Sequence, residues 1–456
     1  MEIPQLVASQ QLYFRTDQTR DVSKRREALK KLRKAIASNE KNIAKALEQD
    51  LGKAKAEAYM TETGIALTSL RYFIRNIRTL AKDKKAKTPV TLMPGKCRIV
   101  AEPYGCTLII APWNYPFLLA IDPLIAAVAA GNCAIVKPSE MAPATSQVIA
   151  DIIKSCFEPD WVAVCQGGIE TSEALLKERF DYIFYTGSPR VGKIVMQHAA
   201  MHLTPVTLEL GGKSPCIIDE TADIEVAVRR TVFGKVVNAG QTCVAPDYLL
   251  VHQSWRDRLP EVFKAQSELL LGEKPLESKE YTHIINRKHF DRLTAYLQDG
   301  KVLAGGDIRT DTLTITPTLL EVSDPNVSVM QEEIFGPILP VIFYEHISEV
   351  YEYVRSHEKP LALYLFSTDY SVIDYVMHNI PFGGGCINDT LMHVATHHLP
   401  FGGIGNSGMG QYHGQWGFET FTHQKSVVMK PLAGDLSFRY PPYTWKKLRL
   451  IKFFLR

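Results

Sequence analysis

The stretch "CTLIIAPWNYPFLLAIDPLIAAVAAGNCAIVKPSE", residues 106–140, is the part of the sequence that decides the fold class. An apolar run at 106–112 leads into a mostly apolar helical segment at 117–130, and a second apolar run follows at 133–139. The glycine and asparagine at 131–132 are typical of the end of a helix. Short apolar strands that alternate with helices predict a parallel sheet covered by helices on both faces.

The same alternation continues beyond this stretch. Further strands are expected near 161–168, 181–188 and 205–212, with helices near 143–157, 170–178 and 190–202. A second series has helices near 222–238, 255–270 and 287–299, and strands near 247–253, 315–320, 338–344 and 361–367. The sequence therefore predicts a doubly wound α/β domain of nucleotide-binding pattern and, after it, a second α/β domain.

Segments without this alternation flank the two series. Helical spacing is present at 22–51 and again at 54–83, and the lysine-rich residues 82–96 predict an exposed excursion. The segment 381–410 holds so many glycines that we expect loops there, which approach a ligand or another backbone closely.

The composition excludes several classes of protein. The chain has 456 residues, of which 46% are hydrophobic and 22% charged, which is typical of a soluble protein of two or three domains. Its eight cysteines are scattered without a CxxC pair, so we expect neither a disulfide framework nor a metal site. The N-terminus lacks an apolar signal segment, and the apolar stretch 117–130 is shorter than the roughly 20 residues that cross a bilayer. We therefore expect a cytoplasmic protein.

The positive charge is concentrated at the C-terminus. The net charge is +3, but residues 436–456 carry six cations, Arg456 included, and no acid, so the remainder is slightly acidic. Such a body lacks the positive field of a nucleic-acid-binding protein. The tail from Trp445 has helical spacing with apolar residues mostly on one side and cations mostly on the other. This pattern predicts peripheral contact with an anionic membrane or, equally, packing of the apolar face on a dimer or over a substrate entrance.

Cys243, in "NAGQTCVAPDYLL" at 238–250, is a candidate nucleophile. A single cysteine is more often a small buried apolar residue, so other residues must support this interpretation. Asn114 follows a predicted strand directly, where its amide can donate to an oxyanion or bond to its own turn.

Glu209 ends a predicted buried strand, and a carboxylate there is costly unless it is paired or used. It is a candidate general base, with a salt bridge to Lys213 or another lysine as the alternative. Glu333 and Phe335, in "QEEIFGP" at 331–337, form a further carboxylate region.

Two other strand ends are suited to a nucleotide. Lys137 and Glu140 can hold ribose hydroxyls, and the carboxylate would repel a 2′-phosphate; otherwise they are solvated loop charges. Gly187, Ser188 and Gly192 span a strand-to-helix junction whose free N–H groups can face a phosphate, or which is simply an ordinary capped helix.

These stretches, taken together and in order, resemble the aldehyde dehydrogenase superfamily from about residue 20 to about 430. The motifs are "PWNYP" at 112–116, "KPSE" at 137–140, "TGS" at 186–188 with "VGK" at 191–193, "LELGGKSP" at 208–215, "GQTC" at 240–243, "EEIFGP" at 332–337, "NDT" at 388–390 and "PFGGIGNSGMG" at 400–410. The sequence "CVAPDYLL" after the cysteine is most similar to the class 3 branch, which includes fatty-aldehyde enzymes.

The resemblance implies a subunit of three parts. A Rossmann-type NAD(P)-binding domain would comprise residues 1–83 and 104–210, and a catalytic α/β domain residues 211–395. A small bridging and oligomerisation element with the basic tail would comprise 84–103 and 396–456. A homodimer is implied.

The resemblance also assigns roles. Cys243 would attack an aldehyde, Asn114 would stabilise the oxyanion, and Glu209 would act as general base, with Glu333 able to share the proton transfer. The residues implied to contact NAD or NADP are Trp113, Lys137, Glu140, Gly187, Ser188, Gly192, Glu333 and Phe335. The implied substrates are medium-chain or long-chain aliphatic aldehydes, or aromatic ones. An acylating enzyme that uses CoA or phosphate is the alternative on the same fold.

Overall fold

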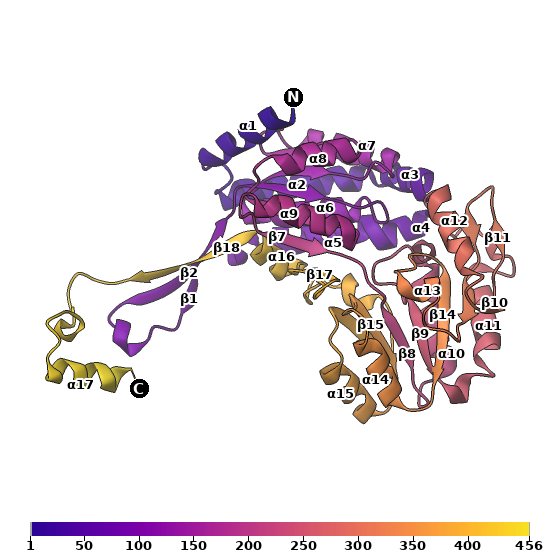
Figure 1. The fold of residues 1–456 in the computed structure, drawn as a ribbon. Coiled ribbons are helices and arrows are strands. Elements are labelled where there is room, and N and C mark those ends of the chain that lie inside the picture. Colours follow the sequence, from indigo (N-terminus) through magenta and orange to yellow (C-terminus); the bar gives the residue numbers. More distant parts are fainter. Residues whose placement is uncertain (1, 456) are drawn as a thin grey trace.

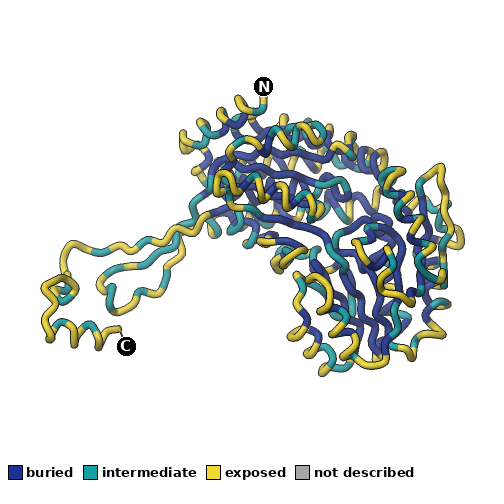
Figure 2. The backbone as a smooth tube through the Cα atoms, in the orientation of Figure 1, coloured by how far each residue is buried: buried dark blue, intermediate teal, exposed yellow. Residues whose placement is uncertain are grey.

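The computed structural model describes residues 2–455, so Arg456 of the tail lies outside the described part. Two α/β bodies lie side by side, and a small antiparallel sheet projects from them with the C-terminal helix at its far end (Figure 1). Buried backbone is concentrated in the two bodies, whereas the projecting part is mostly exposed or half-buried (Figure 2).

The first body is built on a six-stranded sheet of order β17-β7-β6-β3-β4-β5. Its strands are β3 (Cys106–Ile110), β4 (Cys133–Lys137), β5 (Val162–Val164), β6 (Tyr182–Thr186), β7 (Val206–Glu209) and β17 (Gly408–Met409). All pair in parallel except β17, which is antiparallel to β7. The chain runs outward from β3 to β5 and then crosses to β6, so β3 and β6 flank a switch point, where ligands of open α/β sheets bind.

Both faces of this sheet are covered, as the alternation of strands and helices predicts. Leu108 and Ile110 of β3 pack in a cluster with α1, α8 and α9, whereas Ile109 belongs to the larger cluster of α2, α5, α6 and α7. The bounds are α1 (Ile3–Arg15), α2 (Val22–Ser38), α3 (Glu40–Leu51), α4 (Lys55–Ala58), α5 (Gly64–Leu80), α6 (Leu118–Ala130), α7 (Pro143–Cys156), α8 (Ile169–Lys177) and α9 (Pro189–Ala200).

Two of the expected helices are interrupted. The helix expected at 22–51 is two helices, because Asn39 leaves the helical conformation and its side chain bonds the carbonyl of Ala35. The helix expected at 54–83 contains a π-helical turn, Tyr59–Thr63, between α4 and α5. This turn carries Glu62, a buried carboxylate near the candidate site.

The second body has a seven-stranded sheet of order β10-β13-β14-β9-β8-β15-β16, parallel except for β10. The strands are β8 (Pro215–Ile218), β9 (Tyr248–His252), β10 (Lys301–Ala304), β13 (Thr318–Glu321), β14 (Ile338–Tyr344), β15 (Ala362–Phe366) and β16 (Gly384–Ile387). Its main helices are α10 (Ile224–Val236), α11 (Leu259–Leu271), α12 (Arg287–Tyr296), α14 (Ile347–Arg355) and α15 (Tyr370–Asn379). Its short elements are α13 (Ser328–Gln331) and the β11–β12 pair (Ile308–Arg309 and Thr314–Ile315), whereas the short helix α16 (Gly414–Thr420) packs on α5 and α6 of the first body.

The glycine-rich segment 381–410 is not composed only of loops, contrary to expectation. β16 is the edge strand beside β15, and a Cβ on Gly385 would lie 2.0 Å from the carbonyl oxygen of Leu363. Glycine is required here for close strand pairing. Residues 408–409, assigned from the sequence to the bridging element, instead extend the first sheet as β17.

The projecting sheet has the order β1-β2-β18, with β1 (Lys84–Ala86), β2 (Lys96–Pro103) and β18 (Thr422–Met429). It joins the exposed excursion to the C-terminal part of the chain, because β2 pairs with β18 over its whole length. Helix α17 (Trp445–Phe454) follows and has no buried residue.

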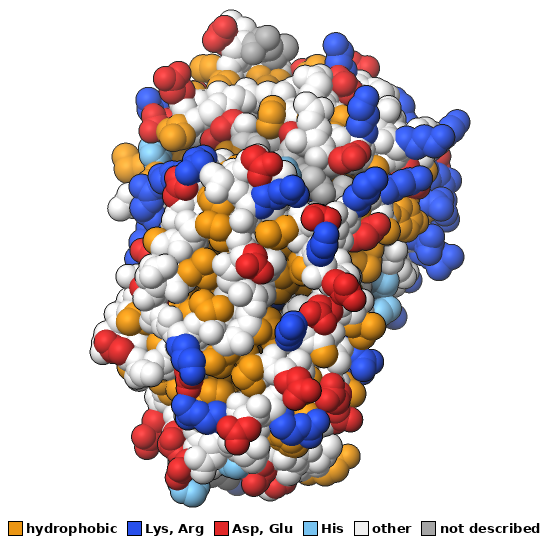
Figure 3. All heavy atoms as spheres, turned by 90° about the vertical axis from the view of Figure 1, so that its right-hand side faces the viewer, with side chains coloured by type: hydrophobic (Ala, Val, Ile, Leu, Met, Phe, Trp, Pro, Cys, Tyr) orange, Lys and Arg blue, Asp and Glu red, His pale blue; other side chains and the backbone are white. Residues whose placement is uncertain are grey.

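The surface charges and the character of the helices complete the description of the fold. On the side of the second body, cations and acids are interspersed over most of the surface (Figure 3). Among residues 2–455, no helix has both the length and the apolar character needed to cross a bilayer.

Candidate active site

A cavity of about 700 Å³ lies at the switch point and is lined by residues of both bodies. The predicted site residues that line it are Trp113, Asn114, Gly187, Ser188, Glu209, Cys243, Glu333 and Phe335. They come from the carboxyl ends of β3, β6 and β7 and from loops of the second body. The fold thus brings together groups that are more than 200 residues apart in the sequence.

Cys243 lies in a tight loop between α10 and β9. Asn238 and Ala239 have positive φ angles of 53° and 50°, and a Cβ on Gly240 would lie 2.3 Å from the carbonyl oxygen of Gly336. These positions hold the loop against the backbone of the second body. All eight cysteines are free, and no group of metal-ligating side chains forms within residues 2–455, so Cys243 is neither in a disulfide nor in a metal centre there.

The environment of the Cys243 thiol favours its protonated form in this structure. Burial raises the pKa of Cys243 well above its usual value, and the charges of Glu333 and Glu209 raise it further. The backbone N–H groups of Cys243 and Val244 act in the opposite direction. Formation of a thiolate therefore requires a base nearby.

Asn114 is 3% exposed and does not bond to its own turn, which excludes the turn interpretation. Its Nδ2 donates to the carbonyl of Gln241 at 3.0 Å, two residues before Cys243. An amide nitrogen has two N–H groups, so one is held by Gln241 and the other is available at the cavity.

Glu209 is buried without a partner. It is 2% exposed, neither carboxylate oxygen has a hydrogen-bond partner among residues 2–455, and burial raises its pKa well above the usual range. The alternative, a salt bridge to Lys213, is wrong, because the Lys213 ammonium bonds Asp247 and the carbonyls of Val329 and Glu332.

Glu333 is a second, half-buried carboxylate, and its buried Oε1 has no hydrogen-bond partner among residues 2–455. Burial and the nearby Asp247 raise the pKa of Glu333 to about 8, although the N–H of Gly212 and the ammonium groups of Lys213 and Lys235 oppose this. A Cβ on Gly211 would lie 2.0 Å from Glu333 Oε2, so the first glycine of the pair makes room for this carboxylate.

Aromatic rings and a helix terminus form the rest of the cavity. Phe335 has a positive φ of 53°, and its ring meets Trp113 edge-to-face with centroids 5.3 Å apart. Gly187 and Ser188 lead into α9, where Ser188 caps the helix by accepting from the N–H of Val191. The buried Thr186 hydroxyl beside them has no partner among the described residues. An aromatic wall, an unpartnered hydroxyl and a helix N-terminus fit a dinucleotide.

Three of the predicted site residues do not line this cavity. Lys137 is buried, and its Nζ lies 2.6 Å from Glu140 Oε2, so these two form an ion pair beyond the cavity wall. Gly192 lies inside α9, and a Cβ there would lie 2.7 Å from Leu210, which gives the glycine a packing reason.

The sequence interpretation missed residues that support the site. His289 packs on Trp113 with ring centroids 5.3 Å apart. Arg292 donates to the carbonyls of Glu333 and Ile334 and so holds the loop that carries Glu333. Both lie on α12. The sequence of this helix is mostly polar and contains no motif that would indicate a functional site.

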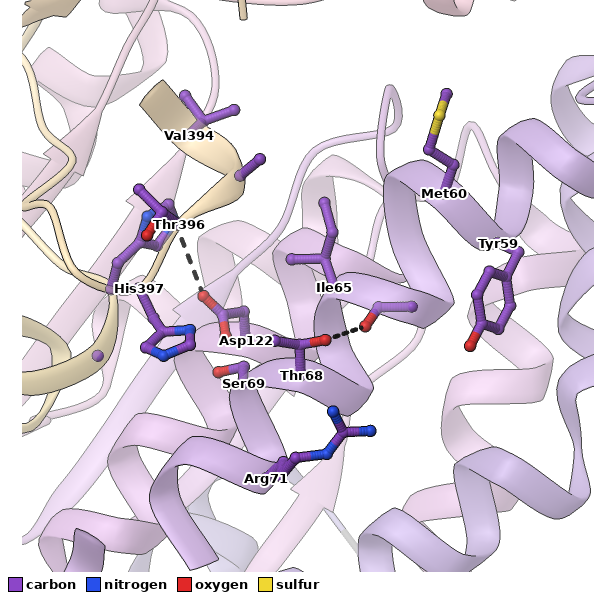
Figure 4. Close-up of a pocket in the computed structure, with 14 residues that line it drawn as sticks. Tyr59, Met60, Ile65, Thr68, Ser69, Arg71, Asp122, Val394, Thr396 and His397 are labelled. Carbon is purple, nitrogen blue, oxygen red and sulfur yellow. Dashed lines mark hydrogen bonds and ion pairs between the residues drawn. The ribbon is translucent and has the colours of Figure 1, made fainter. Parts of the chain in front are cut away.

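A second cavity, of about 460 Å³, opens between α5, α6 and the segment 394–397 (Figure 4). Asp122 lies there between Ser69 and His397, and its carboxylate is 3.9 Å from His413 Nε2. Burial raises the pKa of Asp122 to about 6. Burial raises the pKa of Tyr412, the residue before His413, well above its usual value, and the charges of Asp122, Glu209 and Cys243 raise it further.

Comparison with known proteins supports the family resemblance seen in the sequence motifs, over nearly the whole chain. The model of the aldehyde dehydrogenase family matches residues 2–427. The 4,4'-diaponeurosporen-aldehyde dehydrogenase of Staphylococcus aureus is 49% identical over 97% of each chain, and aldehyde dehydrogenase family 3 member A2 of Rattus norvegicus is 43% identical over 97% of this chain and 92% of its own.

Among solved structures, the substrate-bound state of Staphylococcus aureus AldH superimposes with a TM-score of 0.98 over all of both chains at 48% identity. The aldehyde dehydrogenase KauB of Pseudomonas aeruginosa superimposes with a TM-score of 0.85 at 26% identity, covering 94% of this chain and 89% of its own. The chain therefore belongs to the aldehyde dehydrogenase family, as a class 3-like oxidoreductase that converts aldehydes to carboxylic acids with NAD or NADP.

Proposed function

We propose that Cys243 is the nucleophile of this aldehyde oxidation, Asn114 the oxyanion donor and Glu209 the general base. The observation that carries the proposal is that Glu209, a buried carboxylate without a partner, lines the same cavity as the thiol. A carboxylate kept in such an environment destabilises the folded protein, and groups of this kind are concentrated at functional sites.

The first step follows from the positions of these groups. The thiolate of Cys243 adds to the aldehyde carbon, which forms a C–S bond and places the negative charge on the former carbonyl oxygen. The free N–H of Asn114 and the backbone N–H of Cys243 stabilise that charge, and the loss of one such donor typically costs on the order of 3 kcal/mol in the barrier.

The remaining steps release the acid. NAD or NADP, when bound, supplies the hydride acceptor that turns the adduct into a thioester. Glu209 then takes a proton from water, which attacks the thioester carbon, and the C–S bond breaks to release the carboxylic acid and the thiol. Neither oxygen of Glu209 has a partner among residues 2–455, so this base can accept a proton from water.

Glu209 is a better candidate for this base than Glu333. Burial is the cause of the raised pKa of Glu209, whereas Glu333 accepts from the N–H of Gly212 and is influenced by Lys213, Lys235 and Asp247. We assign Glu333 to the cofactor, together with Phe335 and Trp113 on the aromatic wall. Gly187, Ser188 and Gly192 would serve the phosphates, and Lys137 with Glu140 a ribose.

Replacement of the nucleophile tests the central assignment. Cys243→Ala should abolish acid formation, while the dissociation constant for NAD stays within a few-fold of the native value, because the thiol makes the covalent bond and does not hold the cofactor. Acid formation would be followed by product analysis and NAD binding by fluorescence titration. Turnover retained in Cys243→Ala would contradict the proposal.

The division of labour between the parts of the chain is also proposed. Residues 1–83 and 104–210 would bind the cofactor, 211–395 would carry the thiol, and 84–103 with 396–456 would bridge subunits, except that β17 belongs to the first sheet. We propose a homodimer that uses the projecting sheet. A relative from Canis lupus familiaris, 42% identical over 98% of this chain and 99% of its own, is named a dimeric, NADP-preferring aldehyde dehydrogenase.

The aldehyde would arrive through the second cavity, since the first is suited to the cofactor. Tyr59, Met60, Ile65, Val394 and Ala395 contribute apolar surface there. This lining supports medium-chain or long-chain aliphatic aldehydes, or aromatic ones, as substrates. A Staphylococcus aureus relative at 49% identity is named for 4,4'-diaponeurosporen-aldehyde.

The tail is proposed to contact membranes peripherally. Trp445 and Phe453 are 71% and 74% exposed, and Lys446, Lys447 and Lys452 lie on the same short helix. Exposed aromatic residues with adjacent cations suit an anionic interface.

Deletion of residues 441–456 tests this role. Binding to vesicles of anionic phospholipid should fall, and activity on long-chain aldehydes should fall more than activity on short ones. Lys446→Glu with Lys447→Glu serves as the matched control, because it removes the attraction and keeps the apolar residues. Equal vesicle binding by full-length and truncated protein would exclude the interfacial role and leave the packing role.

A further inference from the structure

A fully buried ion pair lies behind Asn114, on the side away from the cavity. Lys53 and Glu62 are each 0% exposed, and Lys53 Nζ lies 2.6 Å from Glu62 Oε1. The cost of removing two charges from water often exceeds their mutual attraction, so a pair of this kind is poor evidence for a role in stability. The other contacts of Lys53 and Glu62 show which backbone segment the pair holds in place.

The ammonium group is bound to the backbone of the oxyanion donor. Lys53 Nζ donates to the carbonyl oxygen of Asn114 at 3.1 Å and lies 4.0 Å from the ring centroid of Tyr115. The Tyr115 hydroxyl in turn is 2.6 Å from Thr242 Oγ1, next to Cys243. The lysine thus restrains the two residues that follow the loop after β3.

The carboxylate holds the next turn of the same segment. Glu62 Oε2 accepts from the N–H of Phe117 at 2.8 Å and of Leu118 at 3.1 Å, at the start of α6. An acidic group at a helix N-terminus is favourable because it accepts from free N–H groups there. Glu62 reaches this position from the π-helical turn Tyr59–Thr63, a rare geometry that is frequent at functional sites.

A second buried carboxylate connects this arrangement to the loop of the nucleophile. Glu57 Oε1 accepts from the N–H of Asn238 at 2.8 Å. Asn238 Nδ2 donates at 2.9 Å both to the carbonyl of Asn114 and to that of Gln241. The Asn114 carbonyl is therefore held by Lys53 and by Asn238, while its side chain is held by Gln241.

We propose that the Lys53–Glu62 pair positions Asn114, so that the free N–H of its side chain points to the site of the developing oxyanion. The pair holds the segment 114–118 at both ends, and neither residue lines either of the two cavities. It is a positioning device and not a catalytic group, and the inference rests on the proposed role of Asn114.

A double-mutant cycle tests the inference. Asn114→Ala should lower kcat about 100- to 1,000-fold, the usual loss for an oxyanion donor. Lys53→Met should lower kcat about 10- to 100-fold, because a displacement of about 1 Å has that effect on a positioned group. If the lysine acts through Asn114, the combined variant should be no more than about threefold slower than Asn114→Ala alone.

Alkylation of Cys243 by iodoacetamide separates positioning from general damage. This reaction forms the C–S bond without an oxyanion, so its rate in Lys53→Met should stay within about threefold of the native rate. The KM for NAD should remain similarly unchanged. A distorted site would change both quantities together with kcat.

Two further variants guard against misfolding of Lys53→Met, which leaves Glu62 buried and unpaired. Glu62→Gln keeps the size of the side chain, and Lys53→Met with Glu62→Leu removes both charges. Arg25→Met is the matched control: Arg25 is 5% exposed and donates to the carbonyl of Ala129 at 3.3 Å, at the opposite end of α6. Any effect of this control on kcat should multiply with that of Asn114→Ala.

The outcomes are distinguishable. Losses that multiply in the Lys53 cycle would show an independent structural role and overturn the inference, even with Asn114 confirmed as oxyanion donor. An unchanged kcat in Asn114→Ala would instead overturn the proposed function of Asn114, on which the inference depends. Failure of all three pair variants to fold would show a folding role and would also count against positioning.

Discussion

Two groups of buried carboxylates border Asn114, and they differ in one respect. In front, Glu209 and Glu333 line the cavity, and both oxygens of Glu209 and Oε1 of Glu333 have no partner among residues 2–455, although Glu333 also accepts from the N–H of Gly212. Behind, Glu57 and Glu62 accept hydrogen bonds from backbone N–H groups, and Glu62 also pairs with Lys53. All four are at most intermediate in exposure, yet only the group at the back is satisfied.

The difference separates two uses of a buried charge. A carboxylate that is fully bonded holds backbone segments in place, because each contact it makes would be costly to break. Burial raises the pKa of Glu57 as well as that of Glu209, so it is the free lone pairs of Glu209 that distinguish it as a candidate base. Such a group lowers the stability of the folded protein in return for activity.

The largest effect is expected when Glu209, one of the two carboxylates that line the cavity, is replaced. Glu209→Gln should lower steady-state turnover by about 10²- to 10⁴-fold, the usual contribution of a general base. Acylation should survive better than deacylation, so a burst of NADH followed by slow turnover should appear in stopped-flow absorbance. If Glu333→Gln shows the burst and Glu209→Gln does not, the two roles must be exchanged.

A second prediction concerns stability, where the two groups should respond with opposite signs. Glu62→Leu leaves Lys53 buried without a partner and should destabilise the protein by about 3–5 kcal/mol. Glu209→Gln should stabilise it at high pH. Because the pKa of Glu209 is raised above the usual 4.5, its penalty is absent below that pH and grows as pH rises through the folded-state pKa.

Thermal unfolding at pH 5 and pH 8 checks this prediction. The midpoint of Glu209→Gln should exceed that of the native protein at pH 8, and the difference should shrink towards pH 5. A difference that grew as the pH was lowered would mean that Glu209 is paired in solution. Glu62→Leu should be destabilised at both pH values.

The smallest effect is expected for Glu140, which is paired with a lysine but is more exposed than the four carboxylates compared above. Glu140 is 43% exposed in its side chain and pairs with the buried Lys137. The carboxylate should favour NAD by repelling a 2′-phosphate, so Glu140→Gln should shift the ratio of kcat/KM for NAD and NADP towards NADP by a few-fold. A native enzyme that prefers NADP would contradict the proposed role of Glu140.

Much of the fold was predictable from the sequence, because it depends on the local pattern of apolar and polar residues. The alternation of apolar strands and helices from residue 106 onward predicted both α/β bodies, and β14 has the bounds that were expected. The predictions were wrong where contacts between residues distant in the sequence determine the secondary structure. Asn39 divides a continuous helical pattern, and β16 forms in a glycine-rich segment because Leu363 of the neighbouring strand requires a residue without a side chain.

For the candidate site, too, some features were predictable from the sequence and others only from the structure. The sequence alone determined the family, through ordered motifs, and with it which thiol, amide and carboxylate to consider. Only the tertiary structure decided that Glu209 is unpaired, that Lys213 bonds Asp247 instead, and that Lys53 and Glu62 lie behind Asn114.

The physical reason is that a motif records the identity of a residue, whereas its hydrogen bonding depends on groups brought near by folding. Lys53 and Asn114 are 61 residues apart, and Glu57 and Asn238 are 181 apart. No local pattern can show such a partner, and no local pattern can show that a partner is missing. The sequence therefore determined which chemistry is available, and the packing of the two bodies decided which charges are free to perform it.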